Sequence, residues 1–144
     1  MTTIQSHTPT PAPAWAVLER RLFDAMDQAA PLFIDRYTRP DGTLIWIEEY
    51  PGDGVWADDL YESFINWPAY YALGGGPYVG EKAVHEWNAV TRQLTNHYGR
   101  ASNEFVNDDD WFHNSENYIY FYALGLSDPT NAEMMRRARR LPSR

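Results

Sequence analysis

The chain contains an internal repeat, and this constrains its fold more than any other feature. Residues 59–74, DLYESFINWPAYYALG, align with residues 110–125, DWFHNSENYIYFYALG, at an offset of 51 positions (110 − 59). A period of about 50 residues is typical of a supersecondary unit that must stack on a neighbour to bury its apolar face. The identities fall at matching places: Asp59 with Asp110, Asn66 with Asn117, Tyr71 with Tyr122, and the tripeptide Ala-Leu-Gly at the C-terminal end of each stretch.

Each repeat predicts a pair of helices. The units cover about residues 56–98 and 107–144, and apolar side chains recur in them at spacings of three and four. Pro68 must kink or break the first helix of its unit, because proline removes a backbone donor. We expect a fold of the all-α class, with helices as its main elements, built from repeated helical hairpins. The expected helices cover residues 15–30, 58–73, 80–98, 110–124 and from about 130 onward.

The N-terminal third departs from the repeat. Residues 1–14 contain three alternating prolines and predict a disordered lead. Residues 15–30 predict an amphipathic helix, with Trp15, Leu18, Leu22, Met26 and Ala29 on one face. Beyond Pro31, residues 33–50 place a Pro-Asp-Gly turn before a β-rich run, which predicts a small β-hairpin or, alternatively, a long loop. The expected domain is therefore residues 15–144.

Composition excludes several classes of protein. The 144 residues are 44% hydrophobic and 15% aromatic, enough for one domain with a core. The net charge of −8 disfavours nucleic acid. Every aromatic cluster is interrupted by Asp, Asn or Glu, so we expect no membrane span. Residues 1–14 lack a basic residue and the apolar run of a secretory signal, so we expect a cytoplasmic protein. With no cysteine there is no disulfide, thiolate metal site or cysteine nucleophile.

Polar side chains recur at helical spacing inside the two aromatic-rich stretches. Both trios occupy positions i, i+3 and i+7, which puts each on one face of its helix. Acids, amides and imidazole among aromatic rings are typical of a pocket that stacks sugar faces and hydrogen-bonds hydroxyls. The trios are Asp59, Glu62 and Asn66, then Asp110, His113 and Asn117; the nearby rings include Trp67, Tyr70, Trp111, Tyr118 and Phe121.

Helix capping is the alternative explanation for the acids that begin helices. The helix dipole stabilises acids in a first turn whatever the protein does, and we favour capping for Asp58, Asp59 and their counterparts Asp109 and Asp110. Glu62 and His113 lie a turn further in and differ between repeats, as a specialised site requires, so both explanations stay open for them. A metal site is disfavoured, because only one His accompanies the acids Asp110 and Glu116. We expect no metal and no cofactor.

The order of these features resembles the inner and outer helices of the (α/α)6-toroid families of glycoside hydrolases and polysaccharide lyases. The resemblance covers about residues 15–140 and rests on an acidic pair, a helix ending in YALGG, a partner helix, then DWFH and YALGL. It implies an oligosaccharide or sugar-acid substrate and a pocket at the mouth of a ring. The residues it places there are Trp56, Asp58, Asp59, Glu62, Trp111, His113 and Asn117.

The resemblance implies carboxylate acid and base chemistry. Glu62 or Asp59 would act as general acid beside a second carboxylate, and His113 would orient a group or shuttle a proton. A lyase would instead need His113 or a tyrosine as base. Asn66 and Trp67 would complete the substrate-binding set. Hydrolase, lyase or neither all remain open from the residues alone.

Chain length limits this hypothesis. A ring of six units needs about 300 residues, so the sequence predicts an incomplete toroid, a fragment whose exposed repeat edges favour self-association. The alternative of a different class is a non-catalytic helical scaffold that binds a peptide or protein. Exposed Glu62 and His113 would favour the scaffold, and their convergence in a cleft would favour the enzyme.

Overall fold

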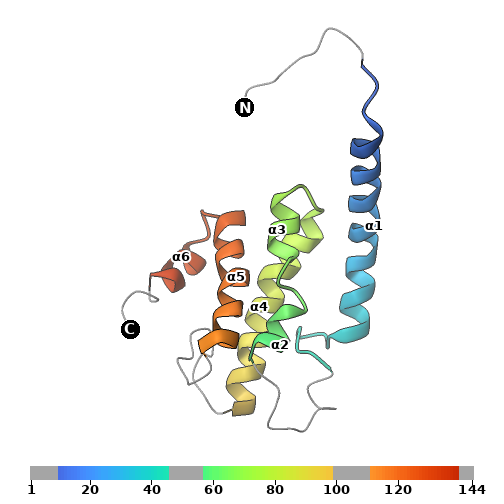
Figure 1. Cartoon of the computed structure of the whole chain (residues 1–144). Helices are drawn as coiled ribbons and strands as arrows, with labels where there is room; N and C mark the ends of the chain where they lie inside the picture. The colour runs from blue at the N-terminus through green and yellow to red at the C-terminus, as the bar shows by residue number, and fades with distance from the viewer. Residues whose placement is uncertain (1–9, 46–56, 99–110, 140–144) are drawn as a thin grey trace.

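The computed structural model is a helical protein with α1 along one side of a bundle (Figure 1). It describes residues 10–45, 57–98 and 111–139, with the helix backbone alone for residues 57–59, 94–98 and 111–117. None of the described helices is both long and apolar enough to cross a membrane. The helices are α1 (Ala14–Tyr37), α2 (Ala57–Glu62), α3 (Trp67–Ala72), α4 (Pro77–Tyr98), α5 (Trp111–Ser127) and α6 (Ala132–Ala138).

Helix α1 runs through Pro31 and ends only at Tyr37. The predicted end near residue 30 was wrong, because buried Ala30 and Ile34 anchor the helix on both sides of the proline. Proline removes only one hydrogen bond, and packing against the bundle compensates for its loss. Thr38 ends the helix: its backbone N–H and its hydroxyl both donate to the Ile34 carbonyl, at 3.0 and 2.9 Å.

The β-hairpin predicted at residues 33–50 is not formed as expected. Residues 33–37 belong to α1, and beyond them the described residues hold one antiparallel bridge, between Thr38 and Leu44. A tight turn connects the two, with the Arg39 N–H donating to the Thr43 carbonyl at 2.8 Å. Gly42 occupies this turn at φ 84°, a conformation that favours glycine. The rest of the predicted second strand, residues 46–50, lies outside the described residues.

The helix predicted at residues 58–73 is broken before Pro68, which confirms the effect expected of this proline. Tight i to i+3 bonds connect α2 to α3, as the Phe64 N–H donates to the Tyr61 carbonyl and the Trp67 N–H to the Phe64 carbonyl, each at 3.0 Å. Pro68 lies in the first turn of α3, where its missing N–H costs nothing. The chain leaves α3 through Gly74 at φ 112°.

The two repeats both fold as helical hairpins, α2 and α3 with α4, and α5 with α6. Helix α5 packs along α2 and α3, and α4 packs behind them (Figure 1). Trp87 of α4 is the centre of the core: it stacks on Tyr61 at 4.3 Å between ring centroids and meets the edge of Tyr120 at 5.0 Å. The mainly helical fold is thus as predicted, and the described residues do not form a closed ring.

Candidate functional site

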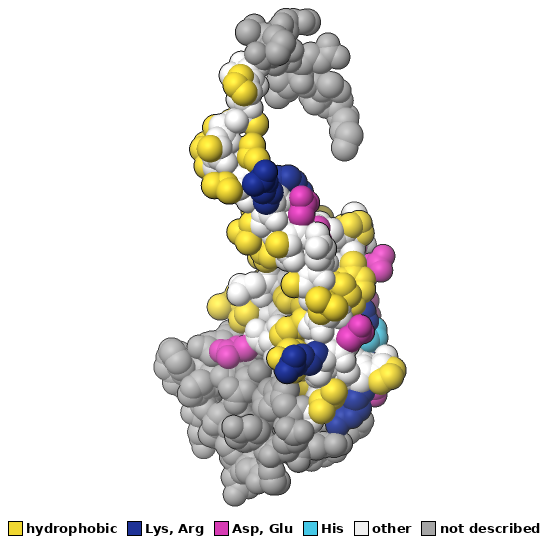
Figure 2. Space-filling view, turned by 90° about the vertical axis from the view of Figure 1, so that its right-hand side faces the viewer, with side chains coloured by type: hydrophobic (Ala, Val, Ile, Leu, Met, Phe, Trp, Pro, Cys, Tyr) yellow, Lys and Arg dark blue, Asp and Glu magenta, His cyan; other side chains and the backbone are white. Residues whose placement is uncertain are grey.

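Helix α1 carries a row of exposed apolar side chains that no described element covers. We call this row the α1 stripe; it comprises Trp15, Leu18, Leu22, Ala25, Ala29 and Leu32. Its four large members are 57 to 68% exposed. Hydrophobic side chains are visible along α1 in Figure 2. Spacings of three and four over 18 positions are the a and d pattern of a coiled-coil seam.

A different face of α1 attaches it to the bundle. Phe23 meets the edge of Tyr70 at 5.1 Å between ring centroids, and Ala30 and Ile34 are buried. The Tyr70 hydroxyl lies 2.8 Å from the Phe23 carbonyl and 2.9 Å from Asp27, and these two acceptors share its single hydrogen. Asp27 also accepts the Gly76 N–H at 2.8 Å. The amphipathic character predicted for α1 is therefore real, but its packing face is centred on Phe23 and Asp27 rather than on Leu18 and Leu22.

An apolar hollow of about 260 Å³ opens between α1, α3 and the start of α4. The hollow offers few polar groups to a ligand, because the Tyr70 hydroxyl is already hydrogen-bonded to Asp27 and to the Phe23 carbonyl. Burial, followed by the hydrogen bond to Asp27, raises the pKa of Tyr70 to about 12. The hollow adjoins the α1 stripe, since Ala29 belongs to both. The lining residues are Met26, Ala29, Ala30, Phe33, Asn66, Trp67, Tyr70 and Val79.

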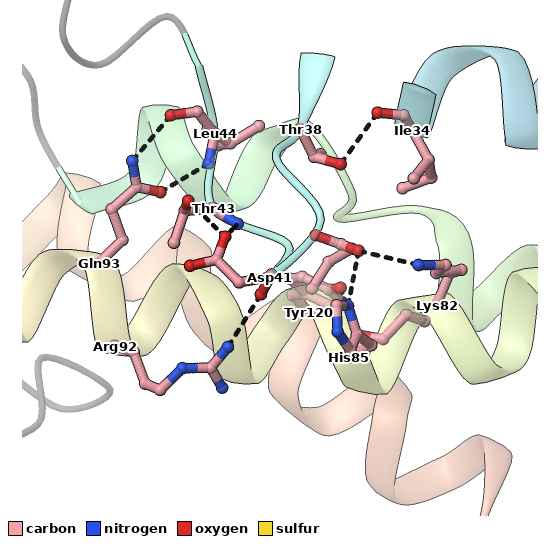
Figure 3. A network of polar contacts seen from close by, with 12 residues as sticks. Ile34, Thr38, Asp41, Thr43, Leu44, Lys82, His85, Arg92, Gln93 and Tyr120 are labelled. Atoms are coloured by element: carbon pink, nitrogen blue, oxygen red, sulfur yellow. Dashed lines mark hydrogen bonds and ion pairs between the residues drawn. The ribbon is translucent and has the colours of Figure 1, made fainter. Parts of the chain in front are cut away.

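A second cluster fixes the turn after α1 against α4 (Figure 3). The Gln93 side chain brackets the backbone of Leu44: its Oε1 accepts the Leu44 N–H and its Nε2 donates to the Leu44 carbonyl, both at 2.8 Å. Arg92 donates to the Asp41 carbonyl at 3.0 Å. A Cβ on Gly42 would lie 2.7 Å from the Cβ of Ala89, so the turn and the helix fit closely only with glycine.

Glu86 is a fully buried carboxyl beneath this turn. Its Oε1 lies 2.8 Å from Nδ1 of His85 and 3.8 Å from Nζ of Lys82, while Oε2 has no hydrogen-bond partner among the described residues. Burial raises the pKa of Glu86, and His85 and Lys82 oppose the rise. A buried carboxyl under a tight turn cannot reach a substrate in this arrangement. We interpret the cluster as a structural clamp on residues 38–45.

The structure brings only part of the predicted site together. Glu62 is exposed at the end of α2, Asn66 is exposed at the rim of the hollow, and Trp67 lines the hollow and meets the edge of Phe64 at 5.3 Å. The backbone of α2 lies against α5. The two helices that carry the predicted trios are therefore neighbours.

The other predicted site residues are described in backbone only or not at all. Trp56 and Asp110 lie outside the described residues. The side chains outside the described set are those of Asp58, Asp59, Trp111, His113, Glu116 and Asn117. Among the described residues, no group of three or more His, Cys, Asp or Glu could hold a metal ion. The proposed convergence of Asp59, Glu62 and His113 stays a prediction.

Sequence reasoning missed the residues that make the exposed face and the clamp. Leu32 extends the heptad spacing of α1, a signal hidden by treating Pro31 as the end of the helix, and Ala25 lies inside the predicted helix but was left out of its apolar face. Glu86 follows Ala83 and precedes Val90 at helical spacing, and both neighbours are buried. That spacing was the available sign that a carboxyl lies on the buried face of α4.

The chain belongs to the family described as Domain of unknown function (DUF8034), whose model matches residues 3–143. No curated protein and no solved structure matches the chain. The family description names no substrate or partner.

Proposed function

We propose that this chain is a helical docking domain that binds an amphipathic partner helix along α1 and over the adjoining hollow. One observation carries the proposal: six heptad positions of α1 are exposed together, beside an apolar hollow of about 260 Å³. Soluble proteins rarely leave large contiguous apolar patches uncovered unless those patches bind something. This is the scaffold alternative raised by the sequence, and the exposed Glu62 supports it.

The shape of the surface favours a helix over a small ligand. From Trp15 to Leu32 the α1 stripe spans 17 residues, or about 26 Å at 1.5 Å per residue. A second helix can follow that length and insert its own apolar side chains between those of α1. A sugar needs convergent donors and acceptors, whereas the hollow is lined mainly by apolar atoms and its tyrosine hydroxyl is engaged.

Burial of the α1 stripe can supply the driving force. A leucine side chain removed from water contributes about 1.5 to 3 kcal/mol. Leu18, Leu22 and Leu32 are each more than half exposed, so covering them offers several kcal/mol against the cost of association. The stripe therefore contributes to binding free energy rather than to the stability of the isolated bundle.

A labelled peptide tests the proposal. The probe is a fluorescein-labelled helix with leucine at a and d and mixed Glu and Lys elsewhere, and fluorescence anisotropy reports its binding. We expect saturable binding to the wild type and loss of binding with Ala29→Glu, which places a charge where the stripe meets the hollow. Val17→Glu is the matched control, because Val17 is also exposed on α1 but lies off the stripe. Equal binding by all three proteins would reject the docking surface.

A second candidate function is oligosaccharide binding or cleavage by an incomplete (α/α) toroid. The observation that favours it is the packing of α2 against α5, which makes neighbours of the helices carrying the two predicted trios. In this proposal Asp59 and Glu62 supply the carboxylates, His113 moves or orients a proton, and Asn66 and Trp67 bind sugar.

Uronic-acid oligosaccharides test this second function, by binding in calorimetry and by release of reducing ends. We expect Glu62→Gln and His113→Ala to reduce turnover at least 100-fold, by analogy with loss of a general acid or base. Glu81→Gln, an exposed acid on α4, should leave turnover unchanged. Absence of binding and cleavage by the wild type would reject this function and leave the docking proposal standing.

A further inference from the structure

We propose that the helix bound by the α1 stripe is α1 of a second copy of this chain, paired antiparallel with the first. The inference rests on the proposed docking function and names its partner. It follows from the order of side chains in the stripe. When two copies of the stripe run in opposite directions, a leucine of one copy faces an alanine of the other in each inner layer.

The register of the pairing is fixed by the spacing. With Trp15, Leu22 and Ala29 at a and the other members at d, an antiparallel pair places a opposite d of the partner. Each facing pair of residue numbers then has the same sum, 47, so a two-fold axis passes between positions 23 and 24. The facing pairs are Trp15 with Leu32, Leu18 with Ala29, and Leu22 with Ala25. This symmetry closes the assembly at two copies.

Side-chain size supports the antiparallel direction. Each inner layer pairs a leucine with an alanine, which fills the space between two helices evenly. A parallel pair would instead place Leu22 on Leu22 and Ala25 on Ala25, so two crowded leucine layers would be followed by two poorly filled alanine layers. In the antiparallel pair Leu18 of the second copy lies opposite Ala29, which lines the hollow, so the hollow has an apolar side chain available to fill it.

Charge and access are compatible with this pairing. Arg21 and Asp24 lie on one edge of the stripe, and in the register above Arg21 of one copy comes within two residues, about 3 Å of axial rise, of the level of Asp24 in the other. The packing residues Phe23 and Ala30 precede Ala25 and Leu32 by two positions, about 200° around the helix. The partner helix and the bundle therefore contact different faces of α1, and the two faces meet at Ala29 beside the hollow.

Molecular mass in solution tests the pairing. Light scattering coupled to size exclusion should give about twice 16.7 kDa for the wild type. Leu22→Glu should give the monomer mass, because it places two charges in the central layers, whereas the matched control Val17→Glu should stay dimeric. A monomeric wild type at about 0.1 mM, or a Leu22→Glu protein that stays dimeric, would overturn the proposal.

Direction is tested with spin labels, since the chain has no cysteine of its own. Labels on Gln28→Cys, an exposed position beside the stripe, lie about 14 Å apart along the axis in the antiparallel pair, and labels on Ala14→Cys lie about 28 Å apart. Equally short distances at both positions would indicate a parallel pair and overturn the register. A monomer that still binds the leucine peptide would reject the second copy as partner but retain the docking function, and a monomer that binds no peptide would reject both.

Discussion

The core face of α4 and the outer face of α1 have the same sequence pattern and opposite environments. Both have apolar residues at spacings of three and four, yet Trp87 is completely buried while Leu22 is 57% exposed. Trp87 is covered by aromatic rings from α2 and α5, whereas no described element covers the α1 stripe. Periodicity therefore identifies an apolar face, but whether that face is covered depends on what other elements bring to it.

The difference assigns the two faces different energetic roles. Burial of Trp87 and its ring neighbours stabilises the bundle itself. Helix α1 is held to that bundle by its opposite face, so its stripe is available for an intermolecular contact. Substitutions on the two faces, and at the joint between α1 and the bundle, test this division.

Trp87→Ala should destabilise the bundle by about 3 to 5 kcal/mol, because it removes a fully buried ring and leaves a cavity. Urea unfolding followed by circular dichroism measures the change. Trp15→Ala is the matched control: Trp15 is 68% exposed, and at protein concentrations where the chain is monomeric its loss should cost within about 0.5 kcal/mol. A similar loss of unfolding free energy for the two substitutions would show that the two faces contribute equally to stability, and would contradict the division between them.

Tyr70→Phe should cost about 1 to 2 kcal/mol, because it deletes the hydroxyl that joins α3 to the Phe23 carbonyl and to Asp27. The substitution tests whether these hydrogen bonds hold α1 to the bundle. Amide hydrogen exchange should rise in residues 23–34 of α1. Tyr71→Phe, at the exposed neighbouring tyrosine, is the control and should change neither stability nor exchange; an equal effect there would argue against the joint.

Glu86→Gln should stabilise the protein at pH 8 by on the order of 1 kcal/mol, since a buried neutral amide costs less than a buried carboxylate. The folded-state pKa of Glu86 is raised above the ordinary 4.5, mainly by burial. Its contribution to stability is therefore present below pH 4.5 and is lost as the pH rises through the raised folded pKa.

The pH dependence supplies the check on that assignment. The unfolding free energy of the wild type should fall relative to Glu86→Gln between pH 4.5 and 8. Glu81→Gln, at an exposed position on the same helix, should follow the wild type across this range. A difference in unfolding free energy between wild type and Glu86→Gln that stays constant from pH 4.5 to 8 would contradict the raised pKa of Glu86.

Much of the helical fold could be predicted from local signals. Pro68 marked the break between α2 and α3, and the amphipathic spacing predicted helices near the observed α1, α4 and α5. The helix end expected at Pro31 was wrong, because the helix continues through the tertiary packing of Ala30 and Ile34, which local sequence rules do not include. Tertiary packing also explains why residues 33–37 are helical instead of forming the first strand of the expected hairpin, of which the described residues show one bridge, between Thr38 and Leu44.

The candidate site was less predictable than the fold. Asn66 and Trp67 were identified as binding residues and line the hollow, but the pattern could not indicate that the hollow is apolar or that α1 supplies one of its walls. Glu86 escaped notice because burial of a carboxyl depends on the turn at Gly42 packing over it. The toroid and the roles of Asp59, Glu62 and His113 stay predictions.

The clearest test of the claim that the α1 stripe serves association is the dependence of the unfolding midpoint on protein concentration, measured for the wild type and for Leu22→Glu. If the α1 stripe serves association, the wild-type midpoint rises with concentration, the variant midpoint does not, and the two coincide at high dilution. Two kinds of result would contradict the claim. One is a Leu22→Glu midpoint below that of the wild type at every concentration, by as much as for Trp87→Ala; the other is a wild-type midpoint that does not change with concentration.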